Sequence, residues 1–222
     1  KWTKSAKNSF EVRNQKLGII GYGNIGSQLS VLAEAMGMEV YFYDIVDKLA
    51  LGNAKKCRTQ EELLSKVDIV SLHVDGRPSN KNIFGKEQFE QMQEGSYFLN
   101  LARGHVVIIE DLVDALDSNK ILGAGVDVFP TEPKTNNEPF DNVLKGKDNV
   151  ILTPHIGGST AEAQVHIGNY VPEKIISYIN TGSTYGSVNL PNLQLPSFKN
   201  SHRLLHIHRN TPGILATINN KL

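Results

Sequence analysis

Three polar residues of this 222-residue sequence could form a catalytic set, because each follows a short apolar run typical of a buried strand. They are Arg103 in the run LARG, Glu132 in PTEP and His155 in TPHIGG. A histidine can take up a proton near neutral pH, a carboxylate beside it stabilises the imidazolium, and the planar arginine fork can bind a substrate carboxylate. Such a set suits the oxidation of a 2-hydroxy acid, although each residue alone is more often structural.

That oxidation needs a hydride acceptor, and residues 16–44 contain a binding signature for one. The apolar run Leu17–Ile20 precedes GYGNIG at Gly21–Gly26, a helical pattern follows, and Asp44 ends the next apolar run. This is the full context of a dinucleotide-binding fingerprint, in which the glycines admit a pyrophosphate and the acid binds the ribose hydroxyls. Asp44 therefore favours NAD over NADP. The alternative is a glycine turn in an unrelated α/β domain.

Strands and helices must alternate to position these side chains, and the sequence after residue 44 has that alternation. It predicts an α/β fold of the Rossmann type, a doubly wound parallel sheet. Ligands of such sheets bind beyond the carboxyl ends of the strands, so His73 and Asp127, at two of those ends, join the candidate residues. The strand-like runs are Asp68–His73, Tyr97–Asn100, Leu122–Val128 and Asn149–Leu152.

The composition gives no support for a nucleic-acid-binding, membrane-bound or disulfide-rich protein. The 23 basic and 23 acidic residues cancel, which gives no indication of a nucleic-acid partner or an anionic membrane. The single cysteine, Cys57, excludes an intramolecular disulfide framework and suits a reducing compartment. No apolar run has the length of a membrane span, and no signal-peptide core follows the first residues, so we expect a cytoplasmic protein.

Four motifs resemble those of the D-isomer-specific 2-hydroxyacid dehydrogenases: GYGNIG, LARG, DVFPTEP and TPHIGGST. The resemblance covers nearly the whole chain and implies NAD as cofactor. It implies Arg103 as the anchor of the substrate carboxylate, Glu132 as the acid paired with the histidine, and His155 as the general acid/base. We expect cofactor contacts from Gly21, Gly23, Asn24, Ile25, Gly26, Asp44, His73, Leu101, Ala102, Arg103, Asp127, His155, Gly157 and Gly158.

The motifs of residues 16–160 leave the substrate open. Family members that act on lactate, glycerate, glyoxylate or formate share them, and so do non-catalytic NAD-binding corepressors; an inactive fragment is a third alternative. Two positions depart from the family pattern, since Asp75 replaces a proline expected after Val74 and Leu101 occupies a position that is often polar. Neither belongs to the candidate catalytic set.

Residues 202–222 carry a further resemblance. A strand-like run at Arg203–His208, followed by Asn210 and a Pro-Gly pair that opens a helix, looks like the start of an ACT domain, a small α+β module that binds amino acids. Family members that oxidise 3-phosphoglycerate in serine biosynthesis carry such a module as a serine-inhibition site. The tail therefore implies 3-phosphoglycerate as substrate and serine as effector, with His208 and Asn210 as serine contacts across a dimer interface.

We expect five segments: an N-terminal segment or helix at 1–15, the NAD-binding Rossmann domain at 16–158, a helix returning to a substrate lobe at 159–181, a linker at 182–201 and a truncated ACT-like domain at 202–222. In the helix, Pro172 predicts a kink or break, and Val165, Ile167, Ile175, Ile176 and Ile179 are expected to pack. The start without methionine and the end within a new helical pattern suggest a piece of a longer protein, which we expect to be a homo-oligomer. The resemblance implies a substrate lobe that precedes the nucleotide domain and is not visible here, so we expect this piece alone to bind NAD weakly and to turn over little or no substrate. No metal is expected, because no Cys or Glu completes a set with His202, His206 and His208.

Overall fold

The computed structural model describes residue 2, residues 4–5 and residues 10–222. Part of the predicted segment 1–15, residues 1, 3 and 6–9, therefore lies outside the described residues. The chain divides into two compact units, Lys1–Ile156 and Gly157–Leu222, and each is described by itself.

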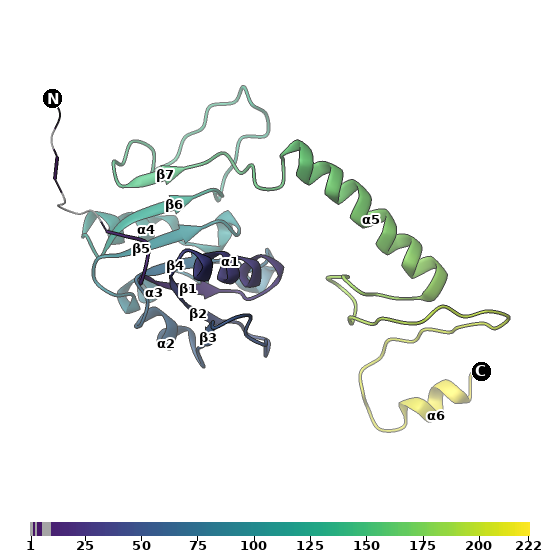
Figure 1. The fold of residues 1–222 in the computed structure, drawn as a ribbon. Coiled ribbons are helices and arrows are strands. Elements are labelled where there is room, and N and C mark those ends of the chain that lie inside the picture. The colour runs from purple at the N-terminus through teal and green to yellow at the C-terminus, as the bar shows by residue number, and fades with distance from the viewer. Residues whose placement is uncertain (1, 3, 6–9) are drawn as a thin grey trace. The chain divides into compact units, whose positions relative to one another are not determined.

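The first unit is built on a seven-stranded parallel sheet with the order β3-β2-β1-β4-β5-β6-β7 (Figure 1). This confirms the predicted doubly wound sheet. The order runs away from β1 in both directions, so the carboxyl ends of β1 and β4 form the switch point at which such sheets bind ligands. The strands are β1 (Lys16–Ile20), β2 (Glu39–Tyr43), β3 (Lys55–Lys56), β4 (Ile69–Leu72), β5 (Ser96–Asn100), β6 (Ile121–Val126) and β7 (Val150–Leu152).

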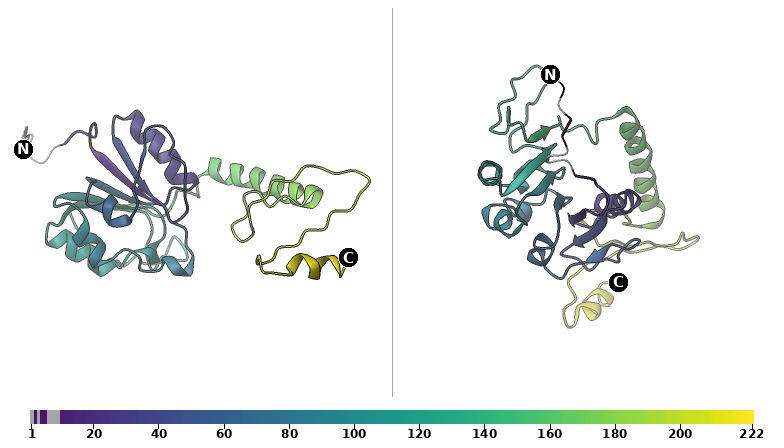
Figure 2. Two further views of the ribbon diagram at one scale, coloured as in Figure 1. Left: turned by 90° about the horizontal axis from the view of Figure 1, so that it is seen from below. Right: turned by 60° about the vertical axis from the view of Figure 1, so that its left-hand side comes forward.

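Helices cover both faces of the sheet, with α1 on one face and α2, α3 and α4 on the other (Figure 2). A separate apolar core lies under each set of helices. The helices of this unit are α1 (Asn24–Ala35), α2 (Gln60–Leu64), α3 (Lys86–Gln91) and α4 (Ile109–Asp117), and two short 3₁₀ helices are η1 (Pro78–Asn80) and η2 (Gly104–Val106).

Strand β1 shows why a nearly continuous apolar run suits a sheet covered on both sides. Leu17 and Ile19 belong to the core under α1, whereas Ile20 belongs to the core under α2–α4. Gly18 lies between them, and a Cβ there would approach Leu63 of α2 to 2.6 Å. Because both faces are buried, the strand carries no polar alternation.

Two side chains cap the N-terminus of α2. Thr59 Oγ1 accepts a hydrogen bond from the Glu62 N–H at 3.1 Å, as expected of an N-cap. The Glu62 carboxylate accepts from the N–H of Arg58, at 2.7 Å, rather than from the N–H of the capping residue. Both bonds satisfy donors at the start of the helix.

The second unit contains α5 (Ala161–Thr181) and α6 (Ile214–Asn219). Helix α5 continues through Pro172, so the expected break is absent. The carbonyl that the proline ring crowds belongs to Gly168, four residues earlier, whose backbone adjusts more freely than that of other residues. The packing predicted for the apolar side chains of α5 is wrong within the described residues, where none of them is buried.

The strand predicted at Arg203–His208 is also wrong, because this run has no regular secondary structure. A strand is defined by the hydrogen bonds that it makes to a neighbouring strand, and the described residues of the second unit contain no strand. The helix predicted to begin at Ile214 is present as α6. No described helix combines the length and the apolar character needed to cross a membrane.

Candidate active site

The three fingerprint glycines are required for three different reasons. Gly21 has a φ of +93°, and a Cβ there would lie 2.7 Å from the backbone of His73. Gly26 packs against the turn, since its Cβ would lie 2.2 Å from the Gly21 carbonyl oxygen. Gly23, by contrast, has open space where its Cβ would be, which leaves room for a ligand at the N-terminus of α1. This arrangement fits a pyrophosphate held by the first N–H groups of α1.

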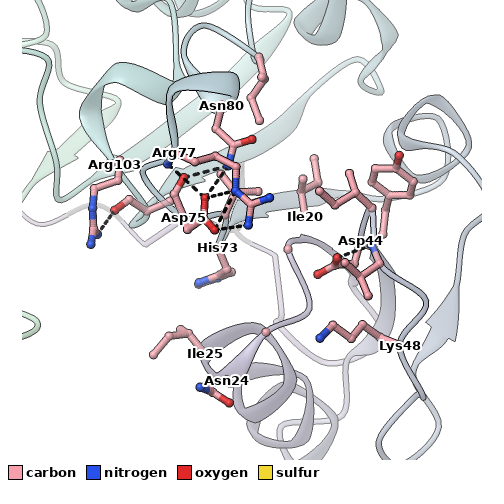
Figure 3. Close-up of a pocket in the computed structure, with 18 of the residues that line it drawn as sticks. Ile20, Asn24, Ile25, Asp44, Lys48, His73, Asp75, Arg77, Asn80 and Arg103 are labelled. Carbon is pink, nitrogen blue, oxygen red and sulfur yellow. Dashed lines mark hydrogen bonds and ion pairs between the residues drawn. The ribbon is translucent and has the colours of Figure 1, made fainter. Parts of the chain in front are cut away.

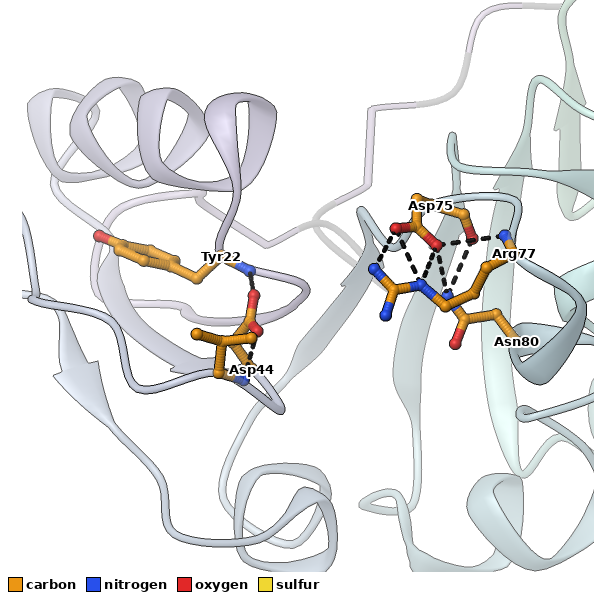
Figure 4. A network of polar contacts seen from close by, with 6 residues as sticks. Tyr22, Asp44, Asp75, Arg77 and Asn80 are labelled. Atoms are coloured by element: carbon orange, nitrogen blue, oxygen red, sulfur yellow. Dashed lines mark hydrogen bonds and ion pairs between the residues drawn. The ribbon is translucent and has the colours of Figure 1, made fainter. Parts of the chain in front are cut away.

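Asp44 is held in place at the end of β2 before any ligand binds. Its Oδ2 accepts a hydrogen bond from the Tyr22 N–H at 2.7 Å, and its Oδ1 accepts from the Val46 N–H at 2.8 Å (Figure 4). Each oxygen keeps a further lone pair for a ribose hydroxyl. Tyr22 is itself fixed, because its ring stacks on Phe42 with centroids 3.7 Å apart.

A cavity of about 500 Å³ lies at the switch point of the sheet (Figure 3). It brings together residues from the loops after β1, β2, β4 and β5, as predicted for the carboxyl ends of parallel strands. The predicted cofactor residues that line it are Gly21, Gly23, Asn24, Ile25, Asp44, His73, Leu101, Ala102 and Arg103.

His73 contributes a neutral imidazole to this cavity. Burial lowers its pKa from an ordinary value of 6.5 to about 4. Its Nε2 lies 2.8 Å from the Ser71 hydroxyl, and its backbone N–H donates to the Ile20 carbonyl at 2.7 Å. The ring is thus fixed beside the glycine turn and adds no charge to the site at neutral pH.

Arg103 is positioned by a buried asparagine and a close backbone contact. Asn100, at the end of β5, accepts from the Ala102 N–H at 3.2 Å and donates to the Arg103 carbonyl at 3.2 Å. At the next residue, Gly104, a Cβ would lie only 2.0 Å from the backbone of Phe129. The loop with Arg103 therefore packs directly on the loop with Glu132.

Glu132 and His155 form the predicted pair. His155 Nδ1 lies 2.8 Å from Glu132 Oε2, while Glu132 Oε1 accepts from the Phe129 N–H at 2.9 Å. Partial burial alone would raise the pKa of Glu132, but the hydrogen bonds from His155 and Phe129 and the charges of His155 and Arg103 together lower it. Glu132 is therefore a carboxylate at neutral pH. It fixes the Nδ1–H tautomer and leaves Nε2 as the proton acceptor.

Asp127 does not line the cavity. Asp127 is 7% exposed, and its carboxylate accepts a hydrogen bond from Thr153 at 2.6 Å. Gly157 and Gly158 belong to the second unit, so their cofactor contacts stay a prediction, as does that of Asp127. Within the described part of the chain, no group of three or more His, Cys, Asp or Glu could hold a metal ion.

Several cavity residues were not predicted from the sequence. Lys48 follows β2, and Asp75, Arg77 and Asn80 form a hydrogen-bonded group after β4 (Figure 4). The sequence singled out only Asp75 from the segment after β4, as a departure from the family pattern, and gave it no binding role. The rule that ligands bind after strand ends could have included this segment, because it directly follows His73.

A dinucleotide cradle, a glycine turn and a Glu–His pair on a doubly wound sheet define an NAD-linked dehydrogenase domain. Residues 1–157 match the family described as D-isomer specific 2-hydroxyacid dehydrogenase, NAD binding domain. The chain belongs to this family, which confirms the resemblance deduced from its motifs.

Curated relatives of this chain are named D-3-phosphoglycerate dehydrogenase. The protein from Haemophilus influenzae is 56% identical over 98% of this chain, and the one from Dictyostelium discoideum is 50% identical over 100%. The chain spans about half the length of these relatives, 53% and 54% respectively.

Solved structures of other family members have the same fold. D-lactate dehydrogenase with NAD⁺ from Lactobacillus jensenii is 28% identical, with a TM-score of 0.70 over 81% of this chain and 57% of its own. The holo form of D-mandelate dehydrogenase from Rhodotorula graminis is 31% identical, with a TM-score of 0.69 over 78% of this chain and 50% of its own.

Proposed function

We propose that this chain provides the cofactor and acid–base site of an NAD-dependent oxidation of D-3-phosphoglycerate to 3-phosphohydroxypyruvate, the first step of L-serine biosynthesis. The observation that carries the proposal is the 2.8 Å contact between Glu132 Oε2 and His155 Nδ1, beside an arginine that also lines the dinucleotide cavity. The names of the curated relatives support phosphoglycerate as the substrate.

Each residue of the set has a separate role. Arg103 binds the substrate carboxylate through its planar fork. His155 removes the hydroxyl proton through Nε2 while Glu132 stabilises the imidazolium that forms. The bound NAD supplies the hydride acceptor. The charge of Arg103 is the smallest of the contributions that lower the pKa of Glu132, so the substrate anchor also acts on the acid–base pair.

The regulatory part of the proposal rests on the sequence of the tail. We propose serine as an effector bound by His208 and Asn210 in a homo-oligomer of the whole protein, which would act in the cytoplasm. Both residues are exposed in the second unit. Calorimetry of serine binding to the whole protein and to its His208→Ala variant checks this part independently of the dehydrogenase site, and equal binding by the two would contradict it.

Two substitutions test the cofactor site and the acid–base pair separately. Asp44→Ala should weaken NADH binding about tenfold, the effect of losing about 1.4 kcal/mol of ribose hydrogen bonds. His155→Ala should leave NADH binding largely intact and lower turnover of D-3-phosphoglycerate by about 10²–10⁴-fold. NADH binding is measured by fluorescence on the 222-residue chain, and turnover on the product of the complete reading frame that contains it.

Asp47→Ala is the matched control, because this carboxylate is exposed and pairs with Lys56 in the segment after β2. It should bind NADH like the wild type. Equal binding by wild type and Asp44→Ala would refute the cofactor assignment. Faster turnover of D-lactate or D-glycerate than of D-3-phosphoglycerate would refute the proposed substrate while keeping the reaction class.

A further inference from the structure

The loop after β4 carries an ion pair that the proposed proton transfer does not use. Arg77 donates to Asp75 side-on, from Nε to Oδ1 at 2.7 Å and from Nη2 to Oδ2 at 2.5 Å. Asn80 Nδ2 in turn donates to Asp75 Oδ1 at 3.0 Å and to the Asp75 carbonyl at 2.9 Å. The carboxylate of Asp75 therefore fixes the orientation of the Arg77 guanidinium plane, and Asn80 in turn fixes the carboxylate.

The group of Asp75, Arg77 and Asn80 contributes little to the folding stability of the chain. The side chains of Arg77 and Asp75 are 52% and 55% exposed, and exposed ion pairs contribute little to folding. All three residues line the dinucleotide cavity (Figure 3). The consequence of the pairing is a planar cation fixed at the edge of that cavity.

Arg77 faces Asp44 across the cavity (Figure 4). Asp75 raises the pKa of the Arg77 guanidinium, and Asp44 adds to this effect from the opposite side. The two residues are thus within electrostatic reach of each other, so a ribose held by Asp44 would lie close to Arg77.

The covalent order of a dinucleotide indicates which group reaches Arg77. The pyrophosphate belongs at the N-terminus of α1, and Asp44 binds the adenosine ribose. The adenine, attached to that ribose away from the pyrophosphate, must then lie between the loops after β2 and β4. Ile45 and Val46 line the cavity from the first loop, and Val74 and Arg77 line it from the second.

We propose that the guanidinium of Arg77 stacks on the adenine ring of NAD and that Asp75 and Asn80 hold it in the stacking orientation. The inference rests on the cofactor site proposed above and assigns its adenine contact. A planar, delocalised guanidinium stacks on aromatic rings and on nucleobases. Binding of the 2′-phosphate of NADP is disfavoured, because Asp75 already neutralises Arg77 and Asp44 would repel the phosphate.

The test compares the affinities of the full chain and its variants for NADH, ADP-ribose and NADPH. Arg77→Ala should weaken NADH and ADP-ribose binding by the same factor, about fivefold, which is about 1 kcal/mol. Arg77→Lys keeps the charge but not the planar fork, so it should restore only a minor part of the affinity. Asp75→Asn removes the charge that orients the guanidinium and should weaken both ligands about twofold to fivefold.

Arg58→Ala is the matched control, since Arg58 is an exposed arginine that does not line the cavity. Wild-type affinity in Arg77→Ala, or full restoration by Arg77→Lys, would overturn the stacking contact. A loss confined to NADPH would show a phosphate contact instead and would also overturn it. If the wild type binds neither NADH nor ADP-ribose, the proposed cofactor site fails together with this inference.

Discussion

The neutral imidazole of His73 makes the stability of the first unit depend on pH in a defined direction. Its pKa is about 4 in the folded chain, against an ordinary value of 6.5. Between these values the unfolded chain binds a proton that the folded chain does not. The free energy of unfolding must therefore fall as the pH falls through this window.

The size of the effect follows from the two pKa values. The full shift of about 2.5 units corresponds to about 3 kcal/mol at low pH. Between about pH 7.5 and about pH 5, the linkage relation gives a loss of about 2 kcal/mol. That is a large part of the stability of an ordinary domain.

The assay is urea unfolding followed by circular dichroism at several pH values, for the wild type and His73→Gln. Glutamine can keep a hydrogen bond to the Ser71 hydroxyl but does not titrate, so the variant should lose about 2 kcal/mol less than the wild type over this pH range. His166→Gln, at an exposed position of α5, controls for the loss of a histidine. Equal pH slopes for wild type and His73→Gln would refute the buried, neutral imidazole.

Two further predictions concern backbone contact and burial. Gly104→Ala should lower the free energy of unfolding by more than about 2 kcal/mol, because its Cβ would lie 2.0 Å from the Phe129 backbone; an unchanged denaturation midpoint would contradict this. Cys57 is 1% exposed, and burial raises the pKa of its thiol, so the native chain should resist a thiol reagent that labels it rapidly in urea. Rapid labelling without urea would show that this region opens locally.

The sheet and the positions of several candidate site residues at its carboxyl edge could be predicted, because both depend on local pattern. Apolar runs, helical periods and strand-end residues were enough to place the β1 turn, Asp44 and Arg103 correctly at one edge. The group around Asp75 was missed, since its role comes from side chains that meet only when the loop folds. Loops combine turn residues for backbone reasons, so their composition hides any binding role.

In the second unit, by contrast, the sequence pattern predicted a strand and packing that the structure does not contain. The run at Arg203–His208 has a strand-like sequence but no partner strand among the described residues, and none of the apolar side chains of α5 is buried there. Pattern predicts that a segment can form a strand or pack, whereas both outcomes also need a second surface. For that reason the pattern predicted the strands of the first unit, which pair with one another, but in the second unit it predicted only the helices α5 and α6 correctly.

At His155 the backbone preference of the position and its proposed function favour different residues. Its φ of +52° lies in the left-handed region, where a non-glycine residue costs about 1–3 kcal/mol. Glycine would remove that cost but could not accept a proton. The left-handed conformation occurs in the turn that joins β7 to the second unit, where the imidazole contacts Glu132 of a different loop. The hydrogen bond to Glu132 offsets part of this cost. Acid–base pairing and backbone strain therefore occur at the same residue, because a proton-accepting side chain stands at a left-handed position that favours glycine.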